Sequence, residues 1–132
     1  MNSPRIPSSR IFVVEPDDDT RPLLKDNLQR WGYQVIVAID ETDAIQRLRG
    51  GQERFNLILL NQTEQSLDEV MAIGRNIRQY TDLDGLTPIL IIAEQYGADL
   101  EGQDVHLGDH AYVSYLEDGQ QLKLMIQKLC RV

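Results

Sequence analysis

Short apolar runs alternate along the chain with segments whose apolar residues have helical spacing. The runs are rich in Val, Ile, Phe and Tyr, a composition typical of strands, and each is too short to be an ordinary helix. They lie at residues 11–14, 34–39, 55–60, 88–93 and 111–116. We therefore predict five strands, with ordered structure beginning near Arg10.

The segments between the runs predict amphipathic helices. In the last segment, apolar side chains fall at i, i+3, i+4 and i+7, which places them on one helical face: Leu122, Met125, Ile126 and Leu129. Comparable spacing follows the first three strands. The expected boundary residues are Asp19 and Asp40 as helix N-caps, Pro22 in a first turn, and Gly50 with Gly51 at a helix end.

The segment from Glu94 to Asp109 is different. Its apolar residues are sparse, and Gly97, Gly102 and Gly108 interrupt it. Because glycine destabilises a helix interior, we predict only a short or frayed fourth helix there.

Alternating strands and helices predict an α/β fold. Central strands that are apolar throughout indicate a parallel sheet covered on both faces, and right-handed crossovers then produce a doubly wound, flavodoxin-like arrangement. In such sheets, functional residues lie beyond the carboxyl ends of the strands. The residues that follow each strand are therefore the candidates for chemistry.

Length and charge limit the function classes. A chain of 132 residues predicts one domain, with residues 1–9 as a flexible leader and residues 10–132 as the folded unit. Its 21 Asp and Glu against 13 Lys and Arg give a net charge of -8, and no basic cluster is visible. We therefore expect no nucleic-acid partner, because a phosphate backbone would be repelled.

Membrane insertion and secretion are not expected either. The longest apolar runs have five residues, whereas a membrane helix requires about 20. The N-terminal residues lack the apolar region of a secretory signal, and the single cysteine, Cys130, has no partner within the chain. We therefore expect a cytoplasmic, reducing location.

Four positions at strand ends carry the candidate chemistry. The first strand is followed by Glu15-Pro16-Asp17, the third by Asn61, the fourth by Ala93-Glu94 and the fifth by Tyr115-Leu116. The order of elements, with IFVVEPDDDTRPLL, FNLILLNQ, TPILIIAE and GDHAYVSYL, resembles the receiver domain of bacterial response regulators. The resemblance covers about residues 10 to 130 and implies five parallel strands in the order 2-1-3-4-5.

In that family, two acidic residues close the first strand and bind Mg²⁺, and an Asp closing the third strand accepts a phosphoryl group from a histidine kinase. A Thr or Ser closes the fourth strand, and a Lys followed by Pro closes the fifth. The corresponding positions here are Glu15 and Pro16 for the acidic pair, Asn61 for the phosphoacceptor, Ala93 for the hydroxyl residue, and Tyr115 and Leu116 for Lys-Pro. Tyr112 matches the aromatic switch position. Only the first acidic residue and the aromatic switch are retained.

These substitutions remove the chemistry of phosphorylation. The neutral amide of Asn61 lacks the nucleophilic carboxylate needed to form an acyl phosphate. Glu15 alone is a poor Mg²⁺ site, and Tyr115 removes the ammonium that would pair with a transferred phosphoryl group. We therefore predict a pseudo-receiver that signals through protein contacts, is not an enzyme, and has no cofactor or metal ion.

Four alternatives remain. Glu15 and Asp17 form a remnant of the acidic pocket. One of Asp17, Asp18 and Asp19, together with Glu15 or Glu94, would build a cation site, and the competing interpretation is a solvated loop that caps a helix. A working phosphorelay receiver would use another acceptor, such as Asp17 or Glu94, or would carry Asn61 as an engineered substitution. A flavin binder would need a loop rich in glycine and hydroxyl groups after the first strand, but residues 15–20 read EPDDDT. His106 and His110 have a zinc-ligand spacing without further ligands nearby.

Aromatic residues near the fourth and fifth strands form a candidate interface, consisting of Tyr96, Tyr112, Tyr115 and Leu116. In receivers, the usual partner surface is built from the fourth helix, fifth strand and fifth helix. Packing into the core is the competing interpretation for Val113 and Tyr112. The partners implied are a histidine kinase or an output protein, and whether two copies of the chain pair is left open.

Overall fold

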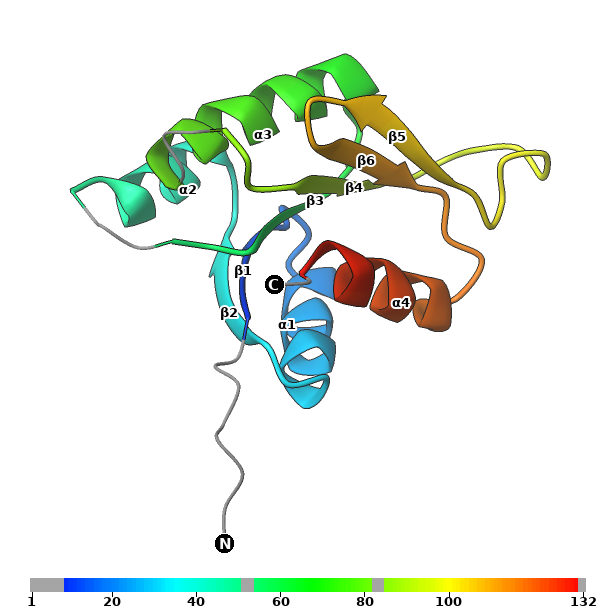
Figure 1. Cartoon of the computed structure of the whole chain (residues 1–132), viewed down its shortest axis with the longest axis horizontal. Coiled ribbons are helices and arrows are strands. Elements are labelled where there is room, and N and C mark those ends of the chain that lie inside the picture. Colours follow the sequence, from blue (N-terminus) through cyan, green and yellow to red (C-terminus); the bar gives the residue numbers. More distant parts are fainter. Residues whose placement is uncertain (1–8, 51–53, 82–84, 131–132) are drawn as a thin grey trace, which may run out of the picture.

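The computed structural model describes residues 9–50, 54–81 and 85–130. In these ranges a mixed sheet lies between two layers of helices, with α2 and α3 on one face and α1 and α4 on the other (Figure 1). The strands are β1 (Arg10–Val14), β2 (Gln34–Ala38), β3 (Leu57–Asn61), β4 (Ile89–Ile92), β5 (Asp104–Gly108) and β6 (Ala111–Ser114). The helices are α1 (Thr20–Arg30), α2 (Glu41–Leu48), α3 (Leu67–Thr81) and α4 (Gly119–Leu129).

The strand order is β2-β1-β3-β4-β6-β5. The first five strands in this list are parallel to one another, and β6 occupies the place of the predicted fifth strand. The doubly wound sheet and its predicted order are therefore confirmed. The chain leaves β1 for β2 on one side and reaches β3 on the other, so the carboxyl ends of β1 and β3 flank the switch point.

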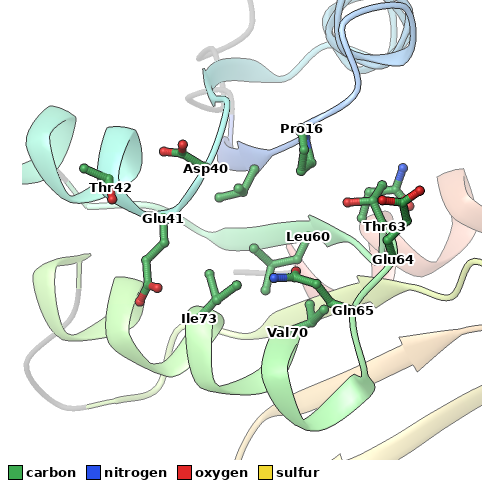
Figure 2. A pocket seen from close by; sticks show the side chains of 12 residues that line it. Pro16, Asp40, Glu41, Thr42, Leu60, Thr63, Glu64, Gln65, Val70 and Ile73 are labelled. Carbon is green, nitrogen blue, oxygen red and sulfur yellow. The ribbon is translucent and has the colours of Figure 1, made fainter.

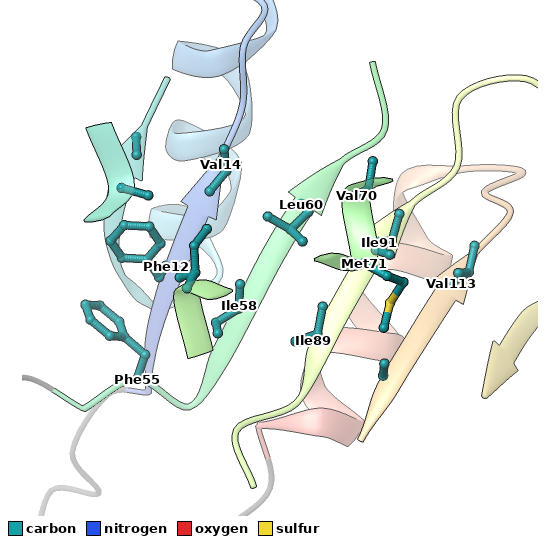
Figure 3. Packing of buried hydrophobic residues seen from close by; sticks show 14 of the residues in the cluster. Phe12, Val14, Phe55, Ile58, Leu60, Val70, Met71, Ile89, Ile91 and Val113 are labelled. Atoms are coloured by element: carbon teal, nitrogen blue, oxygen red, sulfur yellow. The ribbon is translucent and has the colours of Figure 1, made fainter. Parts of the chain in front are cut away.

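Side chains alternate between the two faces along each central strand, as they must in a pleated sheet. Phe12 and Val14 pack with residues of α2 and α3 (Figure 3), whereas Ile11 and Val13 pack with residues of α1 and α4. Helix α3 lies especially close to the sheet at Gly74. A Cβ atom there would lie 2.9 Å from Cδ1 of Leu60, so the close approach requires glycine.

The prediction of a fourth helix between Glu94 and Asp109 is wrong. This segment contains no helix; it ends in β5, which pairs antiparallel with β6. Asp109 and His110 form the connecting turn with φ of 54° and 56°, the positive values typical of a two-residue type I′ hairpin. The glycines disfavour a helix here. The backbone of residues 104–108 instead pairs with β6 as an antiparallel strand.

The buried Arg78 of α3 fixes the hairpin turn in place. Its Nη2 lies 2.7 Å from Oδ2 of Asp109, and its Nη1 donates a hydrogen bond of 2.9 Å to the Asp109 carbonyl oxygen. Arg78 also donates to the carbonyl oxygen of Thr87, at the approach to β4. One guanidinium therefore joins helix α3 to two loops on the same side of the sheet.

The helix starts agree in part with prediction. Asp40 caps α2 by accepting a hydrogen bond of 2.8 Å from the Asp43 N–H. Asp19 occupies the predicted N-cap position of α1, but its side chain makes no capping bond. The carboxylate of Asp17 accepts the hydrogen bond from the Thr20 N–H instead. The predicted leader lies outside the described residues except for Ser9. None of the helices described is long and apolar enough to cross a membrane.

Candidate functional site at the carboxyl ends of β1 and β3

A hydrogen bond between Glu15 and Asn61 lies at the centre of the candidate site. Glu15 directly follows β1 and is fully buried, while Asn61 is the last residue of β3. Asn61 Nδ2 donates to Glu15 Oε1 over 2.6 Å, and the Asp17 N–H donates to Glu15 Oε2 over 3.2 Å. Both oxygens of this buried carboxylate therefore have a donor from the protein itself.

The orientation of the Asn61 amide follows from the same contact. If the amide were turned over, its oxygen would face a carboxylate oxygen and the two acceptors would repel. In the observed arrangement, a neutral donor satisfies a carboxylate that would otherwise be costly to bury. The Asn61 amide thus gives Glu15 a neutral hydrogen-bond donor, and position 61 presents no carboxylate to attack phosphorus.

Arg21 brings a positive charge to the loop after β1, and it was not identified from the sequence. Its Nη1 donates to the Glu15 carbonyl oxygen over 2.9 Å, and its Nη2 pairs with Asp18. The guanidinium thus folds the acidic loop back onto the start of α1. The only signal in the sequence is an arginine one helical turn beyond three aspartates.

The carboxylate of Asp17 is engaged at the start of α1. Oδ2 accepts hydrogen bonds from the Thr20 hydroxyl over 2.6 Å and from the Thr20 N–H over 2.7 Å. These two bonds are the main reason that the pKa of Asp17 lies below its ordinary value. This arrangement agrees with the solvated, capping interpretation of the acidic run. Within the described ranges, no group of three or more His, Cys, Asp or Glu side chains is placed to hold a metal ion.

The loops after β3 and β4 are joined by Gln62 and Glu94, and Gln62 was also missed. The side chain of Gln62 accepts from the Glu94 N–H over 3.1 Å and donates to the Gln65 carbonyl oxygen over 2.8 Å. The Glu94 carboxylate accepts from the Glu64 N–H over 3.0 Å. Ala93 is buried beside them and carries no hydroxyl group. The carboxylate of Glu94 therefore accepts a backbone hydrogen bond from the loop after β3. This contact does not involve Glu15 or Asn61.

The residues of the predicted aromatic interface do not form one patch. Tyr96 and Tyr115 are half-buried against the cluster beneath α2 and α3, with ring centroids 5.3 Å apart in an edge-to-face arrangement. Tyr112 and Leu116 pack against the opposite cluster, beneath α1 and α4, where Tyr112 stacks on His106. The four side chains are thus divided between the two faces of the sheet, because alternate residues of a strand face opposite sides. The Tyr96 hydroxyl nevertheless donates a hydrogen bond to the Leu116 carbonyl oxygen.

The structure also shows the positions of Val113, Cys130 and the two histidines. Val113 is fully buried, in agreement with the packing interpretation. Cys130 is buried, and burial raises the pKa of its thiol to about 11, so at neutral pH it is a protonated, weakly reactive group. His106 lies on β5 and His110 in the following turn, so helical spacing does not apply to them.

A cavity of about 500 Å³ opens between α2 and the loop after β3, next to Asn61 (Figure 2). Val14, Leu60 and Val70 form its apolar part, and Asn61 and Gln65 contribute amide groups to its lining. The cavity therefore lies on the α2 and α3 side of the switch point. Its size is in the range of small-molecule pockets, and Asp40, Glu41 and Glu64 add carboxylates to its lining.

Known proteins resemble this chain mainly in their fold. The chain matches no family model. It is 30% identical over 89 residues to the transcriptional regulatory protein YxdJ of Bacillus subtilis, which covers 67% of this chain and 36% of that protein. The chain therefore spans only about a third of the length of this curated relative.

Solved receiver domains have a similar structure over nearly the whole chain. The receiver domain of the Francisella response regulator 1452 has a TM-score of 0.67 at 14% identity, covering 93% of this chain and 97% of that one. The receiver domain of the hybrid histidine kinase CckA has a TM-score of 0.64 at 17% identity, covering 92% and 99%. The response regulator TrrA of Thermotoga maritima, solved in complex with Mg²⁺ and BeF, has a TM-score of 0.64 at 23% identity, covering 92% and 98%. The chain has the fold of a response-regulator receiver domain, which confirms the resemblance drawn from its sequence.

Proposed function

We propose that this receiver-fold chain is a signalling module of two-component or phosphorelay systems that acts through protein contacts without aspartyl phosphorylation. The observation that carries the proposal is the bond of 2.6 Å from Asn61 Nδ2 to Glu15 Oε1. An amide occupies the place where the family has its phosphoacceptor, and it satisfies the one acidic residue that remains.

Three further positions support this proposal. Pro16 replaces the second acidic residue, Ala93 contributes a buried methyl group, and Tyr115 packs its ring against Tyr96. A transferred phosphoryl group would meet no lysine ammonium at position 115 and no side-chain hydroxyl at position 93. Restoring one residue would therefore not rebuild the site, which argues against a single engineered change at position 61.

Phosphorylation can be tested directly by mass spectrometry of the intact protein. The chain is incubated with acetyl phosphate and Mg²⁺, beside a receiver domain that keeps all its acidic residues. We expect the control to gain one phosphoryl group and this chain to keep its mass. A stoichiometric phosphoryl adduct would overturn the proposal.

The same experiment tests the rival phosphorelay function. If an adduct forms, comparison of Asp17→Asn with Glu94→Gln identifies the acceptor, because only the variant that lacks it loses the adduct. Asn61→Asp serves as the third arm. An adduct on that variant alone would assign the loss of phosphorylation to position 61.

For the partner, we propose a histidine kinase or output protein that contacts the half-buried pair Tyr96 and Tyr115. Edge-to-face aromatic pairs of this kind combine a large apolar surface with little conformational freedom, as is typical of interface centres. The test is binding of a purified candidate partner to Tyr115→Lys, with Tyr112→Lys on the opposite face as the control. Loss confined to Tyr115→Lys is expected, and equal binding by both variants would contradict this placement.

A further inference from the structure

Strand β5 forms an open edge of the sheet. It has β6 on one side and no strand on the other within the described residues, and it is the outermost strand in Figure 1. Its sequence, DVHLG, contains neither proline nor lysine, two residues that protect sheet edges against pairing. The edge therefore has backbone groups available to another strand.

The hydrogen bonds of β6 determine which groups these are. The Ser114 carbonyl oxygen accepts from the Ala93 N–H over 3.0 Å, so Ser114, which lies opposite Asp104, directs its backbone toward β4. The Tyr115 N–H donates to the Gln103 carbonyl oxygen over 2.8 Å, so Gln103 directs its carbonyl toward β6. Because successive residues of a strand point their backbone groups to alternate sides, Asp104 and His106 direct theirs to the open edge.

We propose that β5 pairs antiparallel with β5 of a second copy of the chain, about a two-fold axis at Val105. This register places Asp104 opposite His106 of the second copy, and His106 opposite Asp104 of the second copy. The outward N–H and C=O groups of these residues then form two reciprocal pairs, with four backbone hydrogen bonds. Val105 meets its own counterpart on the face that carries α3.

Charge complementarity favours this register. Asp104 and His106 are both exposed, and they share one face of the strand. Asp104 Oδ1 accepts hydrogen bonds from Ser114 Oγ over 2.6 Å and from Gln121 Nε2 over 3.1 Å, which orients the carboxylate. An imidazole N–H of the second copy can donate to this oriented carboxylate, and the two-fold axis makes the contact twice.

The alternative register, centred on His106, is less favourable. It would place His106 opposite its own copy and Asp104 opposite Gly108. The pairing of β5 with β6 is irregular between His106 and Gly108, and a bulge there twists an edge away from further pairing. The register centred on Val105 uses only the regular part of the strand for its hydrogen bonds.

Two charge variants at the exposed position 106 test the pairing. A contact of this size is below that of a standard interface, so we expect dissociation near 0.1 to 1 mM, as an order of magnitude. In sedimentation equilibrium over that range, His106→Lys should dimerise at least as well as the original chain, because lysine also complements Asp104. His106→Asp should be monomeric, because two carboxylates would face each other. A monomeric original chain at about 1 mM, or equal dimerisation of both variants, would overturn the proposal.

A cross-link tests the register itself. Facing residues of a non-hydrogen-bonded pair have Cα atoms about 4.5 Å apart, within disulfide range, so oxidised Val105→Cys should form a covalent dimer. Leu107→Cys is the matched control, since the two copies of residue 107 would lie about 13 Å apart along the strands. A cross-link at position 107 instead of position 105 would contradict this register. Neither experiment involves a phosphodonor, so its result is independent of the proposed function.

Discussion

At the carboxyl ends of β1 and β3 the backbone follows the receiver fold and the side chains differ, whereas at the β5–β6 edge the backbone itself differs. In the first region, Asn61 donates to a buried Glu15 within an unchanged arrangement of strands. In the second, a segment expected to form a helix pairs as a strand. The same strand framework thus accepts different side chains at its strand ends, while the added edge strand has its own turn and its own anchoring arginine.

Asn61→Asp should break the first region most severely. Two carboxylates would replace the amide–carboxylate pair, which raises the pKa of one of them and lowers the free energy of unfolding by about 3 kcal/mol at neutral pH. The sign follows from the raised pKa. The loss is absent in acid, where both groups are protonated, and grows as pH rises from the ordinary carboxyl pKa to the raised one. Denaturant unfolding from pH 4 to pH 8, without divalent cations, measures this change.

Asn61→Ala is the control for this variant, because it removes the donor without adding a charge. It should cost less, about 1 to 2 kcal/mol, with no comparable increase toward high pH. An Asn61→Asp protein as stable as the original chain at neutral pH would contradict this account of the Glu15–Asn61 hydrogen bond.

Arg78→Ala tests whether the hairpin depends on its anchor. Arg78 is only 5% exposed, and its guanidinium donates to the carboxylate and to the carbonyl oxygen of Asp109. Its removal deprives both Asp109 acceptors and the Thr87 carbonyl oxygen of this donor, so we expect a loss of about 2 kcal/mol together with faster amide hydrogen exchange in β5.

Arg75→Ala provides the matched comparison on the same helix. Arg75 Nε lies 3.7 Å from Asp109 Oδ2, and both side chains are more than half exposed. A pair of this kind contributes only about 0 to 1 kcal/mol. Equal effects of the two substitutions on exchange in β5 would show that burial of Arg78 is not what anchors the hairpin.

Asp17→Asn should change the stability less than the other substitutions. Its effect on the pH dependence of unfolding tests the contacts at the start of α1. Thr20 lowers the pKa of Asp17, so the stabilisation is present above the ordinary carboxyl pKa and is lost as pH falls through the lowered value. The variant should therefore unfold with a flatter acid limb. Asp19→Asn, at a residue without a side-chain capping bond, is the control, and thermal unfolding from pH 2 to pH 6 is the measurement. An unchanged acid limb in Asp17→Asn would show that the Thr20 contacts do not stabilise the start of α1.

Much of the fold could be predicted from the spacing of apolar residues. The five parallel strands and four helices match segments whose periodicity indicated them, because burial of one face imposes that periodicity directly on the sequence. Strand β5 was missed although Val105 and Leu107 alternate with polar neighbours. Three glycines dominated the interpretation of that segment, and its turn uses Asp109 and His110 rather than the glycines that usually mark a type I′ turn.

The candidate site was predictable in position but not in its connections. Strand ends identify Glu15 and Asn61, because parallel strands bring their carboxyl ends to one edge. The contributions of Arg21 and Gln62 depend on the paths of their loops, which carry no periodic signal. Tyr112 and Tyr115 lie on opposite faces of the sheet. The sequence predicts this only if the end of the strand is known, because the alternation of faces holds only while the chain stays extended.

The sequence by itself determined the order of elements, the two buried faces and the presence of an amide at position 61, because composition and periodicity are local properties. Only the tertiary structure decided that the Asn61 amide satisfies Glu15, 46 residues away along the chain. It also decided that Arg78 anchors the β5–β6 turn at Asp109, 31 residues further along. The hairpin formed by this turn places β5 at the edge of the sheet. Such contacts join side chains that are distant in sequence, and their geometry exists only once the sheet has brought its strands together.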